Sequence, residues 1–141
     1  MIRFLFSLFC MISPTIVMGI PFNSQLNEFD EFKEVRFVLM DTVSGSCWTN
    51  LKEVREYTEE KIKMSGMTLN DDGTHQYSFV ISSIGGRTNG LCGGQITVGL
   101  YTTIPLFDDL KGLLTIKELG LTINDRTFNS RVIDLVGEFF K

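Results

Sequence analysis

The chain has 141 residues, of which 43% are hydrophobic and 21% charged, and its formal net charge is −4 at pH 7. This length leaves room for one domain with one hydrophobic core, and the composition is that of a globular protein rather than a disordered one. The acidic balance argues against a nucleic-acid-binding protein, which needs a basic face, and against adhesion to an anionic membrane surface.

Residues 1–19 have the pattern of a secretory signal peptide. Arg3 precedes an apolar run that ends at Ile12, and we predict cleavage after Gly19. A membrane anchor is the alternative, but the run is shorter than the roughly 20 residues that a spanning helix needs. The protein is therefore predicted to be periplasmic or secreted, with no stable membrane insertion after signal cleavage.

The mature chain divides into a polar N-terminal leader, residues 20–33, and a single domain, residues 34–141. The domain opens with residues 34–43, which place apolar side chains on both faces, Phe37 on one and Met40 on the other. Apolar residues on both faces are typical of a strand that is buried on both sides. We therefore predict a central strand here.

Two cysteines, Cys47 and Cys92, remain once Cys10 has been removed with the signal. An even pair in an exported protein predicts one disulfide, which would stabilise the fold by roughly 4 kcal/mol through loop closure. The alternatives are two free thiols or half of a metal site. Zinc is disfavoured because the chain has one histidine and no Cys-x-x-Cys pair.

Residues 50–66 are predicted to form an amphipathic helix. Asn50 and Glu53 resemble a capping box, and Glu59 and Lys63 are spaced as an ion pair on the outer side. A buried stripe at helical spacing is formed by Leu51, Val54, Thr58 and Ile62.

The segment 81–101, ISSIGGRTNGLCGGQITVGLY, is rich in glycine. A two-residue turn at Asn89-Gly90 would place Ile81 opposite Val98 and gather apolar side chains on one face. The phosphate-loop alternative is disfavoured because Leu91-Cys92 stands where Lys-Ser/Thr is required, and because a strand follows in place of a helix. We therefore predict a β-hairpin.

The C-terminal third completes the expected fold. Pro105 is predicted to end the hairpin and residues 105–112 to form a connection. Residues 113–123 form a further strand, or a short hairpin bent at Gly120, and residues 125–141 form an amphipathic helix. The order β-α-β-β-β-α predicts an α+β two-layer sandwich, in which a mostly antiparallel sheet has two helices packed on one face.

Catalytic chemistry finds little support in the sequence. The single histidine, His75, follows a turn, and no Gly-x-Ser-x-Gly motif is present. The acid pairs Asp71-Asp72 and Asp108-Asp109 leave a carboxylate-pair hydrolase open. Residues 70–73 lack the ligand spacing of a calcium loop. We expect no catalytic residue, no metal ion and no cofactor.

The predicted disulfide would bring two short segments together and create a candidate interaction surface. Trp and Arg side chains often anchor protein interfaces. The alternative is structural, in which the tryptophan packs under the disulfide, Asn50 caps a helix and Asn89 makes a turn. The surface consists of Trp48, Thr49, Asn50, Arg87, Thr88 and Asn89.

The favoured function is that of a small exported, non-catalytic binding or accessory protein of an envelope or secreted assembly, acting on a protein partner. The alternative is a small secreted hydrolase or an inhibitor of a hydrolase. A cleft containing His75 and a carboxylate would favour the hydrolase, and a protruding loop at 85–94 would favour the inhibitor. An exposed edge strand would allow a homodimer.

Overall fold

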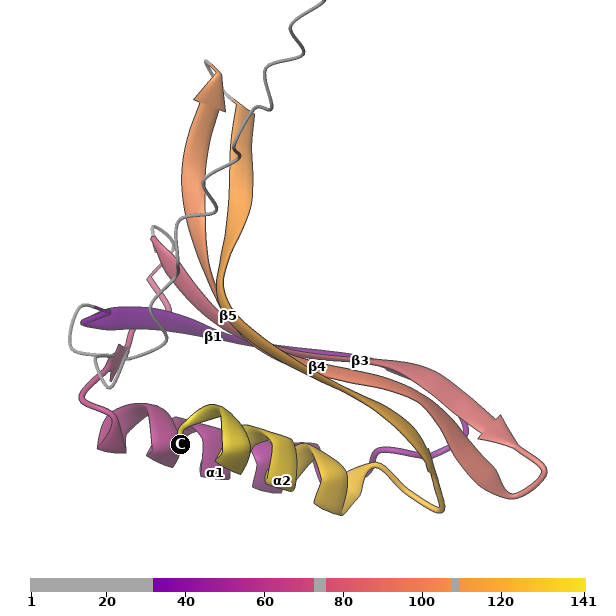
Figure 1. Ribbon diagram of the computed structural model, residues 1–141. Helices are drawn as coiled ribbons and strands as arrows, with labels where there is room; N and C mark the ends of the chain where they lie inside the picture. The colour runs from indigo at the N-terminus through magenta and orange to yellow at the C-terminus, as the bar shows by residue number, and fades with distance from the viewer. Residues whose placement is uncertain (1–31, 73–75, 108–109) are drawn as a thin grey trace, which may run out of the picture.

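A computed structural model describes residues 32–72, 76–107 and 110–141. Over these ranges the chain forms two α-helices and a five-stranded, mostly antiparallel sheet. Both helices lie under one face of the sheet (Figure 1), so the predicted α+β two-layer fold is confirmed. The predicted signal peptide and most of the leader lie outside the described residues.

The sheet has the strand order β2-β1-β3-β4-β5. β1 is parallel to both of its neighbours, and the other pairs are antiparallel. The two-residue β2 has no hydrophobic periodicity and is absent from the prediction. The strands are β1 (Glu34–Val43), β2 (Thr68–Leu69), β3 (Tyr77–Thr88), β4 (Leu91–Phe107) and β5 (Leu110–Asp125), and the helices are α1 (Leu51–Met64) and α2 (Asn129–Phe139).

The β3–β4 hairpin has the predicted register. Ile81 pairs with Val98, and the turn lies at Asn89-Gly90, where both residues have positive φ angles, 51° and 81°. Such angles are those of the tight turns that match the twist of a hairpin. The hairpin contributes much of the inner face, the sheet face that packs against α1 and α2. Besides Cys92, its fully buried apolar members are Phe79, Ile81, Ile96, Val98 and Leu100.

The expectation that β1 is buried on both faces is wrong. Phe37, on the inner face, is buried, whereas Met40 on the opposite, outer face is 49% exposed. In the described chain both helices lie on the inner side of the sheet (Figure 1), so the outer face has no second layer. β1 also lies next to the two-residue β2 rather than at the centre of the sheet.

The predicted end of β4 at Pro105 is also wrong. β4 continues to Phe107, and β5 is a single strand through Gly120. The β3–β4 register ends at Thr102, so residues 103–107 and 110–114 form a two-stranded extension, here called the arm, which rises away from the sheet in Figure 1. Pro105 is tolerated because an unpaired edge requires no N–H donor. The arm carries the exposed side chains of Leu106, Leu113 and Leu114.

Helix α1 buries most of its predicted stripe, with Val54, Thr58 and Ile62 fully enclosed. The capping expectation is wrong: the Asn50 side chain makes no cap hydrogen bond and instead donates to the Glu53 carboxylate at 2.9 Å. Glu59 pairs with Arg55 at 3.7 Å rather than with Lys63. Neither difference alters the position of the helix, because its placement depends on the buried stripe.

Candidate functional site

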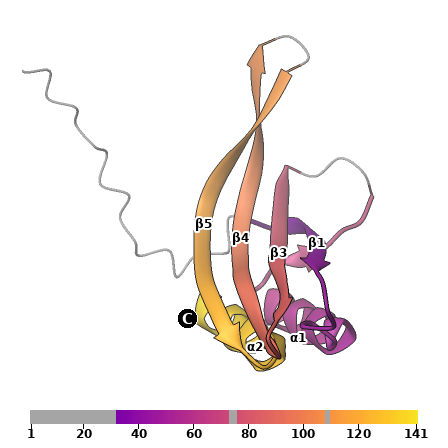
Figure 2. The ribbon, with the colours of Figure 1, turned by 90° about the vertical axis from the view of Figure 1, so that its right-hand side faces the viewer.

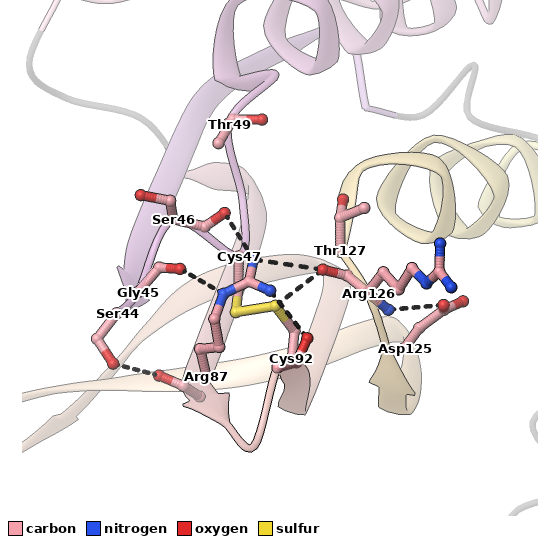
Figure 3. Close-up of a disulfide and its surroundings, with 12 residues drawn as sticks. Ser44, Gly45, Ser46, Cys47, Thr49, Arg87, Cys92, Asp125, Arg126 and Thr127 are labelled. Carbon is pink, nitrogen blue, oxygen red and sulfur yellow. Dashed lines mark hydrogen bonds between the residues drawn. A yellow bond between two sulfur atoms is a disulfide. The ribbon is translucent and has the colours of Figure 1, made fainter.

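The disulfide is present as predicted. Cys47 precedes α1, Cys92 is the second residue of β4, and both are completely buried with their Cα atoms 5.6 Å apart. The bond ties the chain before α1 to the end of the β3–β4 hairpin (Figure 3). The Phe128 amide also donates to the Cys47 carbonyl at 2.8 Å, so the start of α2 is fastened at the same point.

Arg87 uses its guanidinium group to hold three segments of backbone together. Nε donates to the Gly45 carbonyl at 2.9 Å and Nη1 to the Gly90 carbonyl at 3.0 Å. Nη2 lies 3.5 Å from the Ser46 carbonyl and 3.4 Å from that of Arg126. Figure 3 shows the group beside the disulfide. These contacts favour the structural explanation of this arginine.

The residues before α1 are also fixed by internal contacts. Trp48 is only 4% exposed and belongs to the hydrophobic core. The Thr49 amide donates to Asn129 Oδ1 at 3.0 Å, and Asn129 Nδ2 donates to Thr49 Oγ1 at 2.9 Å. Asn50 Nδ2 lies 3.4 Å from the Asn129 carbonyl. The starts of the two helices are thereby joined, and the buried tryptophan offers little surface to a partner.

Four residues of the candidate surface are exposed, namely Thr49, Arg87, Thr88 and Asn89. The side chains of Thr49 and Arg87 are engaged in the contacts described above, which leaves Thr88 and Asn89 at the hairpin turn. Both line a hollow of about 400 Å³, to which Arg87 also contributes. Its other lining residues are Ser44, Gly86, Leu91, Gly93 and Asn124. Gly86 and Gly93 face each other across the β3–β4 pair, and their lack of side chains deepens the hollow. The open part of the candidate surface therefore lies on the outer face of the sheet, beside the disulfide rather than over it.

The outer face near this end carries no charged side chain, a feature that the sequence analysis missed. Strand alternation and the pairing register place the same positions of four strands on this face. Reading every second residue of β1, β3, β4 and β5 would have revealed it. The residues, here called the uncharged patch, are Met40, Thr42, Ser82, Ile84, Gly86, Thr88, Leu91, Gly93, Gln95, Thr97, Gly120, Thr122 and Asn124.

The candidate catalytic groups are not brought together within the described ranges. His75 and the pair Asp108-Asp109 lie outside them, and Asp71 and Asp72 are exposed. Among the residues that the structure describes, no group of three or more His, Cys, Asp or Glu side chains could hold a metal ion. No helix in this part of the chain is both long and apolar enough to cross a membrane.

No protein-family model matches the chain, and no curated protein matches it either. The fold, the disulfide and the geometry of the outer face are therefore the basis on which a function is assigned.

Proposed function

We propose that this protein is a small exported, non-catalytic binding or accessory protein that engages a protein partner through the uncharged patch. The patch lies beside the hairpin turn of Thr88 and Asn89, so it extends the interaction surface expected from the sequence. Export to the periplasm or the extracellular space, as part of an envelope or secreted assembly, is supported by the disulfide, because structural disulfides persist in oxidising compartments.

The composition of the patch is the observation that supports this proposal. Charged residues are depleted at the centres of protein interfaces, and methionine is enriched there. Met40 of β1 and Ile84 of β3 are 49% and 64% exposed. On these neighbouring strands Met40 is opposite Ser82, and Thr42 is opposite Ile84, so two hydroxyl groups lie beside the two apolar side chains. Because most positions of the patch hold glycine, serine or threonine, a flat surface of a partner can approach closely.

The uncharged patch is also held rigid. The disulfide, the Arg87 contacts and the Phe128–Cys47 hydrogen bond fasten the adjoining hairpin end from the inner side. A preorganised surface loses less conformational entropy on binding than a mobile one. Rigidity at this end is therefore useful to a binding protein.

The test is affinity capture from the native compartment with the mature, oxidised protein as bait. Ile84→Glu introduces a charge into the patch, and Met64→Glu makes the same type of change at a 72% exposed position of α1. We expect the partner to be retained by the wild type and by Met64→Glu and to be lost with Ile84→Glu. Equal retention by all three proteins contradicts the proposal.

A third variant separates the patch from the arm. Leu113 on the arm is 66% exposed, and Leu113→Glu leaves the patch intact. Loss of the partner with Leu113→Glu, together with retention by Ile84→Glu, would move the binding surface to the arm and overturn the assignment to the uncharged patch.

A further inference from the structure

The last strand of the sheet, β5, has an unpaired edge. It forms the end of the strand order, beyond β4, and Figure 2 shows it as the outer strand on the side away from β1. Across residues 32–72, 76–107 and 110–141, no strand pairs with its far side. The row of unpaired N–H and C=O groups on such an edge can form hydrogen bonds with another strand.

The stretch from Lys117 to Asp125 is the regular part of this edge. A register shift at Leu100/Tyr101 leaves Ile116 without an opposite residue, but from Lys117 to Asp125 the pairing with β4 is uninterrupted. Neither Pro nor a further bulge interrupts it. The bulge, one of the features that protect an edge strand, therefore lies before Lys117.

Lysine often protects an edge strand, but Lys117 points elsewhere. Its Nζ donates to the Phe139 carbonyl at the end of α2 and lies 4.7 Å from the centre of the Phe139 ring. At the other end of the stretch, Asp125 pairs with Arg131 of α2 at 3.6 Å. Both of these side chains are turned towards the helix side. The third charged residue of the stretch, Glu118, accepts a hydrogen bond from Tyr101 on the outer face. Within the described residues the backbone edge is therefore left uncovered.

The inner-face residues of this stretch form a nearly palindromic pattern. Leu121 is at its centre, Leu119 and Ile123 flank it, and Lys117 and Asp125 are at its ends. If the strand pairs antiparallel with its own copy about Leu121, each Leu119 faces an Ile123 and each Lys117 faces an Asp125. Opposite charges and apolar residues directly across a strand pair are both stabilising.

We propose that the protein forms a homodimer in which residues 117–125 of β5 pair antiparallel with the same residues of a second copy, on a two-fold axis at Leu121. A second copy fits this edge because its own strand supplies the complementary pattern, and a two-fold axis closes the assembly at two chains. Pairing joins the two sheets into one continuous sheet.

Apolar surface on the helix side supports the same register. Leu121 is 36% exposed and Leu119 is half-buried. Leu135 of α2 is also half-buried and lies one helical turn beyond Arg131, which contacts Asp125. In the dimer both α2 helices lie on the same side of the joined sheet, and these leucines approach their counterparts near the axis. The uncharged patch is on the other face, so this inference does not rest on the proposed function.

The first test is the molar mass of the mature, oxidised protein by light scattering and sedimentation. We expect a dimer to become populated as the protein concentration is raised to about 100 μM, because a modest edge interaction has a dissociation constant in the micromolar range. Leu121→Lys places two like charges together at the axis and should weaken association at least tenfold. Ile84→Lys makes the same type of change on the outer face and should leave the dimer intact.

A monomer at all of these concentrations overturns the proposal. A dimer that survives Leu121→Lys but is lost with Ile84→Lys overturns it as well, because the interface would then lie on the outer face.

The second test fixes the register and does not depend on weakening the dimer. Only a residue on the axis faces itself, so Leu121→Cys should form a disulfide-linked dimer on a non-reducing gel. Leu119→Cys lies on the same face of the same strand but faces Ile123 of the second copy, and it should remain uncrosslinked. Equal crosslinking of the two variants, or crosslinking of Leu119→Cys alone, overturns the register centred on Leu121.

Discussion

Tyr101 lies on the outer face of the sheet, across the bare backbone of Gly99. A Cβ atom on this glycine would be only 2.5 Å from the phenol ring, so the glycine makes room for the tyrosine. The Tyr101 hydroxyl donates to Glu118 Oε2 at 2.5 Å. Burial, and then the hydrogen bond and the negative charge of Glu118, raise the pKa of Tyr101 well above its usual value.

The raised pKa of Tyr101 predicts a loss of stability in alkali. Above about pH 10 the unfolded chain releases the phenolic proton while the folded protein keeps it. The unfolded state then binds fewer protons, so the free energy of unfolding falls as the pH rises. Urea unfolding at a series of pH values should show a steeper alkaline fall for the wild type than for Tyr101→Phe. Parallel curves would contradict this account.

The sequence predicted which residues gather around the disulfide, but it predicted only in part what each of these residues does. The sequence placed Trp48 and Arg87 near the disulfide and left an interface and a structural role open. Arg87 has its role because Gly45, Gly90 and Arg126 bring their carbonyl groups to it from separate segments. Local spacing carries no information about such long-range convergence, so the sequence alone could not decide between the two roles.

Among the elements, the glycine-rich strands show how closely β3 and β4 approach each other next to the start of α2. A Cβ atom on Gly94 would lie 2.2 Å from the Ile84 carbonyl oxygen and 2.9 Å from Phe128 Cζ. On the next residue, Gly93, the nearest such atom is the Ile123 carbonyl oxygen at 4.0 Å. Neighbouring glycines on one strand thus differ completely in the space around them.

Gly94→Ala should therefore be far more damaging than Gly93→Ala. Overpacking that displaces backbone costs about 1–3 kcal/mol or more, and we expect at least about 2 kcal/mol for Gly94→Ala. Gly93→Ala, on the open outer face, is the matched control and should change the free energy of unfolding by less than about 1 kcal/mol. Chemical denaturation of both variants measures the difference. Similar losses for the two would mean that the close approach is unimportant.

Features that depend on an element's own periodicity or turn residues could be predicted from the sequence. Features that depend on which other elements pack beside it could not. The register of β3 with β4 follows from Asn89-Gly90 and the alternating apolar residues. In contrast, β4 continues through Pro105 because β3 ends before reaching it. Met40 is exposed because no second layer covers the outer face within the described residues. The length of β4 and the exposure of Met40 both depend on the neighbouring elements, and the sequence of the strand itself carries no information about these neighbours.

For the whole molecule, the disulfide is expected to be a major source of stability. It spans 45 residues, and a loop of that length corresponds to about 4 kcal/mol of loop-closure entropy. That is a large part of the roughly 5–15 kcal/mol typical of a domain. We expect the Cys47→Ala/Cys92→Ala double variant to lose stability by about this amount in urea unfolding. A midpoint equal to that of the oxidised wild type would exclude this contribution.

The parallel pairing of β1 with β3 also has a consequence for the order of folding. The two antiparallel hairpins join strands that follow one another along the chain, whereas β1 reaches β3 only after a loop containing α1 and β2 has closed. Local hairpins form within about 1–10 μs, and contacts distant in sequence form more slowly. The β3-β4-β5 meander should therefore be structured first. Because Cys47 follows β1 and Cys92 lies on the meander, the two thiols come within bonding distance only once β1 has docked, so the disulfide should close late in folding.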